Sequence, residues 1–472
     1  MKTPNFEGYL QVAQGGRASY FYTAYLVNKG WSYKIKKYAL NNLTLTTLIK
    51  NHVEKWAMLV KDKSDAENTF NAFLKDSTLF DEVEKDSKKL LRGYKKKMDS
   101  INISKLTDNQ LGDLVEYFAE QFLNTLFIAR SMRMIDESIM PRFKELFKNE
   151  NNVDEAIAIA CACERLTFPM QEEIAVLEAA MGIKKDKSKT ERIIKKLLEK
   201  YAWVTCGYYT ENPRTWGIYM QKINELINPE KQLAEIRERQ KINLAKRNEL
   251  IKKYPEAKKL ILMGGLAGYF KDVYKSSNNE IVYRGEAIFS ELAKRSGKTL
   301  DFLKDLNPDE LIRIAKKQKI DEDIVNKRLE RGVILNDKDK MIELYGKEAE
   351  EFENKYLKIE NENKNEFRGR AASKGYARAK ARIILDNSQF GKMQKGEILV
   401  VINTSPDFVP IMKKASAIIA EEGGLTSHTS VVSREFGIPC VVGLHNITHL
   451  IKDGDELEVD ANKGIVRILK RD

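Results

Sequence analysis

A single histidine, His428, lies in a run of glycine and hydroxyl residues that could perform phosphoryl chemistry. Neutral imidazole is a good nucleophile near pH 7, because its ordinary pKa of about 6.5 leaves most of it unprotonated. The preceding glycines, Gly423 and Gly424, allow a sharp turn and a close approach to phosphate, while Thr426 or Ser427 can cap a helix that begins there. Amide groups at such a helix start attract an anion. We therefore predict that His428 is the nucleophile and that the other four residues bind phosphate or support the loop. The structural alternative is a capped histidine in an ordinary strand-to-helix turn.

The pattern continues beyond the histidine. The run from Glu421 to Gly443, EEGGLTSHTSVVSREFGIPCVVG, resembles the phosphohistidine signature of the phosphoenolpyruvate synthase and pyruvate phosphate dikinase family. In that family the histidine carries a phosphoryl group between two distant active sites, and the resemblance implies the same role for His428. Arg434 either assists by neutralising phosphate charge or pairs with Glu435 or Glu421.

The resemblance covers about the last hundred residues of the chain. It implies a compact, mixed β/α swivelling phosphohistidine domain at residues 367–472. Thr429 and Ser430 replace the small apolar pair that usually follows the histidine, which leaves the nucleophile in place and the details of phosphate contact open. The expected elements are a strand pair at 369–385, a strand and turn at 396–410, a short helix and strand at 413–419, and a closing hairpin at 453–469.

Residues 1–358 have the periodicity of helices, so we predict a mostly α-helical N-terminal region with a possible subdivision near residue 228. Pro141 falls at an expected break between helices, whereas Pro229 and Pro308 suit first turns. The polar stretch 359–366 is the expected linker, about which the C-terminal domain would swing. The clearest helical segments are 106–136, 153–167, 171–181, 190–202 and 229–253.

Two parts of the family pattern have no counterpart in this sequence. We find neither the carboxylate set of an ATP-grasp domain nor room for a phosphoenolpyruvate-binding barrel. The run Gly297-Lys298-Thr299 only imitates a phosphate-binding loop, because Leu292 stands where the first glycine of such a loop would be. The resemblance thus implies a shortened or split member of the family. We predict no cofactor on this chain, and expect ATP and Mg²⁺ on an ATP-grasp nucleotide-binding partner.

The leading hypothesis is a phosphotransferase subunit of a dikinase-type enzyme, which passes phosphate from that partner to an unidentified small-molecule acceptor. The alternative is a non-catalytic binding or regulatory module derived from the phosphohistidine domain. A third idea is metal binding by His445 and His449, whose spacing suits one helical face. No third ligand lies nearby, so surface or capping roles are favoured and no metal site is predicted.

Composition limits the remaining classes of protein. The 472 residues carry a net charge of +12, but lysines are spread with glutamates along stretches such as 184–200 and 231–253. This mixture favours solvated helix faces over nucleic-acid binding. No apolar stretch is long enough to span a bilayer, and the opening MKTPNFEGYL lacks the pattern of a signal peptide, so we expect a cytoplasmic protein.

Overall fold

The chain is described here by a computed structural model that covers most of the sequence. Its described residues form two compact units: one contains three N-terminal strands together with residues 326–472, and the other runs from residue 64 to 325. Of the predicted linker, residues 359–364 lie outside the described residues, so its flexibility stays a prediction. The described residues are 10–18, 43–50, 53–60, 64–206, 213–337, 340–356, 365–385, 387–404, 408–421, 423–424, 427–444 and 447–471.

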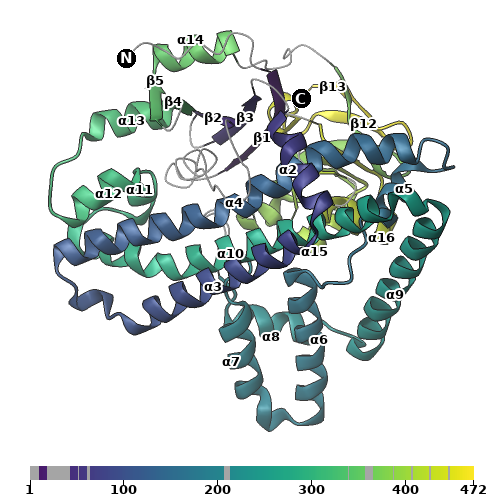
Figure 1. Ribbon diagram of the computed structural model, residues 1–472, viewed down its shortest axis with the longest axis horizontal. Coiled ribbons are helices and arrows are strands. Elements are labelled where there is room, and N and C mark those ends of the chain that lie inside the picture. The colour runs from purple at the N-terminus through teal and green to yellow at the C-terminus, as the bar shows by residue number, and fades with distance from the viewer. Residues whose placement is uncertain are drawn as a thin grey trace. The chain divides into compact units, whose positions relative to one another are not determined.

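The second unit is helical, which confirms the predicted character of this region. Its two longest helices, α4 and α10, lie side by side and form the centre of the unit (Figure 1). The helices are α2 (Ser64–Lys75), α3 (Thr78–Ser100), α4 (Asp108–Leu146), α5 (Val153–Ala160), α6 (Phe168–Lys185), α7 (Thr190–Tyr201), α8 (Trp216–Asn224), α9 (Pro229–Lys253), α10 (Lys258–Ser296), α11 (Leu300–Lys304) and α12 (Pro308–Ala315).

Aromatic side chains fill the space between α4 and α10. Phe118 of α4 is fully buried and meets Phe289 of α10 edge to face, with ring centroids 6.0 Å apart. Tyr94 of α3 is buried in the same core and donates a hydrogen bond to the backbone oxygen of Ile281. Each buried aromatic side chain contributes roughly 1.5–3 kcal/mol of apolar transfer free energy, so this core holds the long helices together.

Most helix starts follow the sequence signals, but one proline does not end a helix. Asn228 caps α9 and Asn307 caps α12, each directly before a proline in the first turn. The predicted break at Pro141 is wrong, because α4 continues through it to Leu146. The side chains of Ile139 and Phe143 on either side of the proline are fully buried, and this packing offsets the hydrogen bond that proline cannot donate.

A carboxylate of α10 caps the start of α6. Asp272 accepts a hydrogen bond from the backbone amide of Phe168 at 2.9 Å. Burial raises the pKa of Asp272 to about 6, against the opposing effects of Lys275, the Phe168 amide and the Thr167 hydroxyl. The folded protein therefore binds this proton more tightly than the unfolded chain does, so stability falls as pH rises from about 4 to 6.

Replacing Asp272 with asparagine should stabilise the protein at neutral pH. The amide keeps an acceptor for Phe168 but is never charged, so the gain should be about 1–3 kcal/mol above pH 7 and small at pH 4. Thermal and urea unfolding at pH 4 and pH 8 would measure this difference, with Glu199→Gln on the exposed face of α7 as the control. A gain of equal size at both pH values would contradict the assignment.

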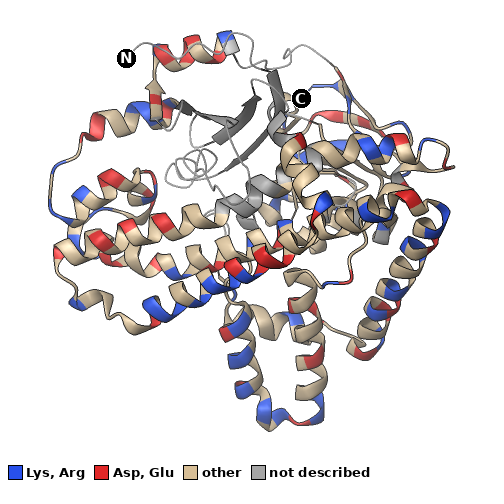
Figure 2. Cartoon of the chain, viewed as in Figure 1, with Lys and Arg blue, Asp and Glu red and all other residues tan. Residues whose placement is uncertain are grey.

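Charged residues are interspersed along the surfaces of the helices (Figure 2). On α9, Lys231 pairs with Glu235 at 3.8 Å and Lys241 pairs with Glu238 at 3.9 Å. These are exposed pairs of the kind expected on a solvated helix. Among the helices that the structure describes, none has the length and apolar character needed to cross a membrane.

The first unit contains a five-stranded sheet that the sequence analysis did not predict. Its strand order is β1-β3-β2-β4-β5, and β2 pairs with β4 through Thr46 opposite Leu335. This pairing joins segments that are far apart in the sequence. The elements are β1 (Leu10–Ala18), β2 (Leu43–Lys50), β3 (Val53–Val60), β4 (Arg331–Asp337) and β5 (Lys340–Tyr345), with α13 (Glu322–Glu330) before β4 and α14 (Lys347–Tyr356) after β5.

The predicted mixed β/α domain is present as an eight-stranded sheet with the order β6-β13-β12-β8-β9-β10-β11-β7. Strands β8, β9, β10 and β11 are parallel to one another, whereas β8 pairs antiparallel with β12 and β11 with β7. The closing hairpin of β12 and β13 is antiparallel as predicted. The strands are β6 (Glu366–Arg368), β7 (Arg370–Ser373), β8 (Tyr376–Ile383), β9 (Ile398–Val401), β10 (Ala417–Ala420), β11 (Cys440–Val442), β12 (Glu456–Asp460) and β13 (Ile465–Lys470), and the helices are α15 (Val409–Met412), α16 (His428–Phe436) and α17 (Ile447–Leu450).

Both faces of the parallel strands are covered. In β9, Leu399 packs into a core with α15 and α16, whereas Val400 packs into a second core on the opposite face. Every residue of β9, β10 and β11 is buried, as expected for parallel strands between two layers. This rigid centre fixes the ends of the strands and the loops that leave them.

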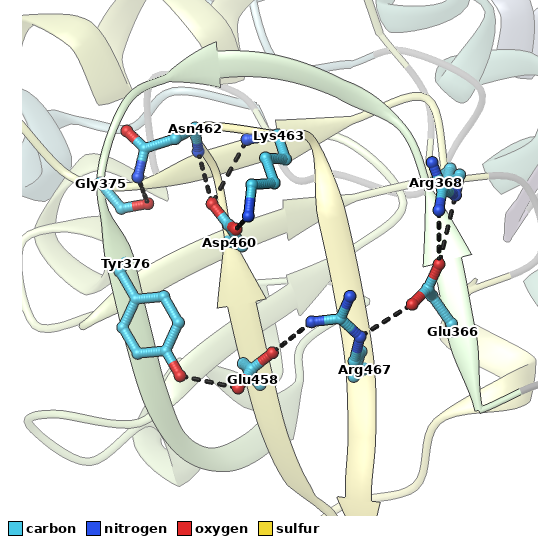
Figure 3. A network of polar contacts seen from close by, with 9 residues as sticks. All are labelled: Glu366, Arg368, Gly375, Tyr376, Glu458, Asp460, Asn462, Lys463 and Arg467. Carbon is cyan, nitrogen blue, oxygen red and sulfur yellow. Dashed lines mark hydrogen bonds and ion pairs between the residues drawn. The ribbon is translucent and has the colours of Figure 1, made fainter.

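The other end of the sheet has an exposed polar ladder. Figure 3 shows that Arg467 of β13 donates to Glu458 of β12 at 2.6 Å and to Glu366 of β6 at 2.8 Å. Tyr376 of β8 donates to the other oxygen of Glu458, and Arg368 completes the chain on Glu366. The ladder connects four strands across one face, and cross-strand pairs of this kind help to set strand register.

Candidate active site

Three parallel strands, β9, β10 and β11, end side by side at one edge of the sheet. Ala420, the last residue of β10, is in register with Val401 at the end of β9 and with Val442 at the end of β11. After β10 the chain continues through the segment that contains Gly423 and Gly424, which we call the glycine loop. It then forms α16 and returns as β11. Open sheets of parallel strands bind their ligands at this edge, so the predicted histidine loop occupies the expected position for a site.

The glycine loop and the start of α16 are fixed by serine hydroxyl groups. Ser427 is the N-cap residue of α16, and its oxygen accepts a hydrogen bond from the amide of Ser430. The Ser430 hydroxyl donates to the backbone oxygen of Gly424 at 2.7 Å. Gly423 has φ +115°, and a Cβ atom there would lie 2.8 Å from the Ser427 oxygen. The loop conformation thus requires glycine at position 423 and supports a cap at Ser427.

The residue after the histidine ties α16 to the neighbouring loop. The hydroxyl groups of Thr429 and Thr404 are 2.9 Å apart and buried. Thr404 follows β9, so this bond joins the first turn of α16 to the segment directly after β9. The hydroxyl residues Thr429 and Ser430, which differ from the family pattern, therefore have a structural role in holding the helix start.

Glu421 anchors the beginning of the glycine loop, a role that the sequence did not reveal. Its carboxylate is buried and accepts hydrogen bonds from the hydroxyl and amide of Thr448 in α17. Its own amide donates to the backbone oxygen of Val401. These contacts hold the loop between α17 and β9, and only the fold brings Thr448 to this position.

Arg434 lies on the last turn of α16 and contacts the edge strand β7. Its Nη1 atom donates to the backbone oxygen of Ala372 at 3.1 Å. In addition, the Ser373 hydroxyl donates to the backbone oxygen of Ser433. These two bonds attach α16 to β7, which is consistent with a structural role for Arg434. Its role in phosphate binding stays a prediction.

The predicted site residues are placed as follows. His428 is the first residue of α16, directly after the Ser427 cap, while its side chain lies outside the described part of the structure. Gly423, Gly424 and Ser427 lie together before it, and Thr426 lies outside the described residues. A residue at this position stands at the positive end of the helix dipole, which favours anions in general.

The structure does not test the idea of metal binding by His445 and His449. His445 and the side chain of His449 both lie outside what the structure describes. Within the described residues, no group of three His, Cys, Asp or Glu side chains is placed to hold a metal ion.

Cys440 in β11 is a free cysteine. Burial raises the pKa of its thiol to about 12, so it stays a protonated core residue.

Comparison with known proteins places this domain in a family. Residues 393–464 match the family described as PEP-utilising enzyme, mobile domain. Most of the C-terminal domain thus matches the mobile domain of PEP-utilising enzymes, as its loop motif suggested.

The similar proteins are much longer than the region they share with this chain. A probable phosphoenolpyruvate synthase of Methanothermobacter thermautotrophicus is 48% identical over 99 residues, which cover 21% of this chain and 14% of that protein. A probable phosphoenolpyruvate synthase of Archaeoglobus fulgidus is 45% identical over 120 residues, or 25% of this chain and 15% of that protein. The phosphoenolpyruvate synthase of Pyrococcus furiosus is 46% identical over 100 residues, which cover 21% of this chain and 12% of that protein.

One solved structure is also similar over a short region. It is a chain of holo-form aconitase X from Thermococcus kodakaraensis, with 21% sequence identity and a TM-score of 0.18. The matched region covers 22% of the present chain and 98% of the aconitase X chain. A TM-score this low does not define a shared fold.

Proposed function

We propose that the C-terminal domain is a phosphocarrier, in which His428 accepts a phosphoryl group at one site and delivers it at another. The observation that supports this most directly is the position of the histidine. It begins a helix at the carboxyl edge of parallel strands, behind a glycine loop, in a domain that matches the mobile domain of PEP-utilising enzymes. Phosphoenolpyruvate synthases share this region with the chain at 45–48% identity in the examples above.

The transfer to His428 is a displacement at phosphorus. A nitrogen of the neutral imidazole forms an N–P bond while the P–O bond to the donor's leaving group breaks, and the leaving oxygen keeps the electron pair. The ring then carries a phosphoryl group with two negative charges. Transfer to an acceptor hydroxyl reverses these changes: an O–P bond forms, the N–P bond breaks, and the hydroxyl proton passes to a base.

The donor in this proposal is ATP with Mg²⁺, bound to a separate ATP-grasp protein. The acceptor is a small molecule, and the helical unit provides surfaces to bind it. The carrier domain would move between the two sites about the part of the predicted linker that precedes β6, residues 359–364. Mg²⁺ on the nucleotide would neutralise charge on the phosphates, while this chain supplies the nucleophile, the capped helix and the glycine loop.

Isolation of the natural partner tests this proposal. The chain would be purified from its source cells with bound proteins, and the complex incubated with Mg²⁺ and radiolabelled ATP. We expect acid-labile, base-stable label on the wild-type chain, and none on the variant His428→Ala. The matched control His449→Gln should be labelled like the wild type.

The regulatory-module alternative gives the opposite result. If His428→Ala forms the same complex and the wild-type chain takes no label from any nucleotide-binding protein in it, the phosphocarrier proposal is wrong. The domain would then act as a docking surface.

A further inference from the structure

Arg370 is the first residue of β7 and lies at the same edge of the sheet as the glycine loop and His428. Strand β7 is antiparallel to β11, with Arg370 opposite Val442, so β7 begins where β11 ends. The guanidinium lies beside the loop: its Nη1 atom is 3.9 Å from the position that a Cβ atom on Gly424 would occupy. The first residue of an edge strand thus brings a positive charge next to the segment before His428.

The other arginines of this domain are already engaged. Arg370 is exposed and has no hydrogen-bond or ion-pair partner among the described residues. Each of the other arginines in residues 367–472 has such a partner there. Figure 3 shows two of the engaged arginines, Arg368 and Arg467, on the polar ladder. The remaining pairs are Arg378 with Glu456, Arg382 with Glu397, Arg434 with the Ala372 oxygen and Arg471 with the Leu450 oxygen.

An arginine in this position suits a phosphoryl group. The guanidinium is always charged and presents N–H donors in a planar fork that matches phosphate oxygens. Gly424 has no side chain to fill the space between the guanidinium and the loop. Arg434, which the sequence suggested for this task, instead donates to a backbone oxygen of β7.

We infer that Arg370 binds the phosphoryl group carried by His428. The inference rests on the proposed function and adds a specific phosphate-binding residue to it. Arg370 makes and breaks no covalent bond. It neutralises charge on the phosphoryl group as the N–P bond forms and holds the group against the helix start. The glycine loop and the guanidinium then form two sides of one anion site.

Phosphoramidate provides a test that needs no partner protein, because it phosphorylates accessible histidines directly. The full chain and the variants Arg370→Gln, Arg370→Lys and Arg378→Gln would be incubated with it. Mass spectrometry would follow phosphorylation of His428, and ³¹P NMR would titrate the attached group. Arg378 is the matched control, an exposed arginine of the same domain that pairs with Glu456. Thermal melts would confirm that each variant is folded.

We expect Arg370→Gln to slow phosphorylation of His428 about tenfold and to raise the pKa of the attached phosphoryl group, because a neighbouring cation favours the doubly charged form. Arg370→Lys should recover part of both effects, and Arg378→Gln should behave like the wild type. A purely structural role would leave the phosphoryl titration unchanged.

Two other outcomes are decisive. If His428 is phosphorylated equally fast in Arg370→Gln and in the wild type, with the same titration, the role of Arg370 is wrong while the phosphocarrier proposal stands. If wild-type His428 takes no label at all, both are wrong.

Discussion

Replacing Gly423 with alanine is expected to reduce the rate of phosphoryl transfer through His428 by about 10²-fold. The residue has φ +115°, which is strained for any residue with a side chain, and the added Cβ would lie 2.8 Å from the Ser427 oxygen. Since Ser427 caps α16, its displacement would move the start of the helix and with it the backbone of His428. A shift of about 1 Å at a reacting atom suffices for an effect of this size.

A glycine at the opposite end of the same helix provides the control. Gly437 has φ +64° and has open space where a Cβ would point. Gly437→Ala should therefore destabilise the domain through its backbone by about 1 kcal/mol but leave the loop intact. Rates of His428 phosphorylation by phosphoramidate, measured for both variants at a temperature where both are folded, would separate the two effects. Equal rates for Gly423→Ala and Gly437→Ala would show that the loop conformation does not position the histidine.

The largest effect on stability is expected in the helical unit, at a buried ion pair. Glu172 of α6 accepts hydrogen bonds from Arg214 at 2.9 Å and from the Tyr219 hydroxyl at 3.0 Å. Glu172 and Arg214 are 3% and 4% exposed. Burial and the Glu172 carboxylate raise the pKa of Tyr219 above its ordinary value, so it stays a donor. Glu172→Ala would leave a buried guanidinium without its carboxylate, which costs about 3–5 kcal/mol.

Thermal and urea unfolding would measure this loss. The control is Glu191→Ala in α7, which removes an exposed partner of Lys195 and should change stability little. The double variant Glu172→Leu/Arg214→Met should recover most of the stability, because it removes both charges and keeps the volume. If Glu172→Ala were as stable as Glu191→Ala, the buried pair would not hold α6 and α8 together.

The site could be predicted from the sequence as far as its features are local. The glycines, the hydroxyl residues and His428 are neighbours in the chain, and a helix that begins at such a run needs only its own capping residue. The structure confirms Ser427 as that residue. The buried runs of β9 and β10 and the turns around the closing hairpin were predictable for the same reason.

The remaining features depend on contacts between distant segments. Arg370 reaches Gly424 only because β7 pairs with β11, and Glu421 meets Thr448 only because α17 packs against the end of β9. The strands of the five-stranded sheet were missed since β2 and β4 pair across nearly the whole helical region. Pro141 shows the converse, where buried neighbours on α4 outweigh a local signal for a helix end.

The identity of the phosphorylated residue tests the central claim most directly. The wild-type chain, charged by ATP and its partner or by phosphoramidate, would be digested at neutral to alkaline pH and its peptides sequenced by mass spectrometry under conditions that preserve phosphoramidates. We expect one phosphoryl group, on His428, that is lost when the charged protein meets the acceptor. Label on other residues only, or label that persists in His428→Ala, would contradict the account.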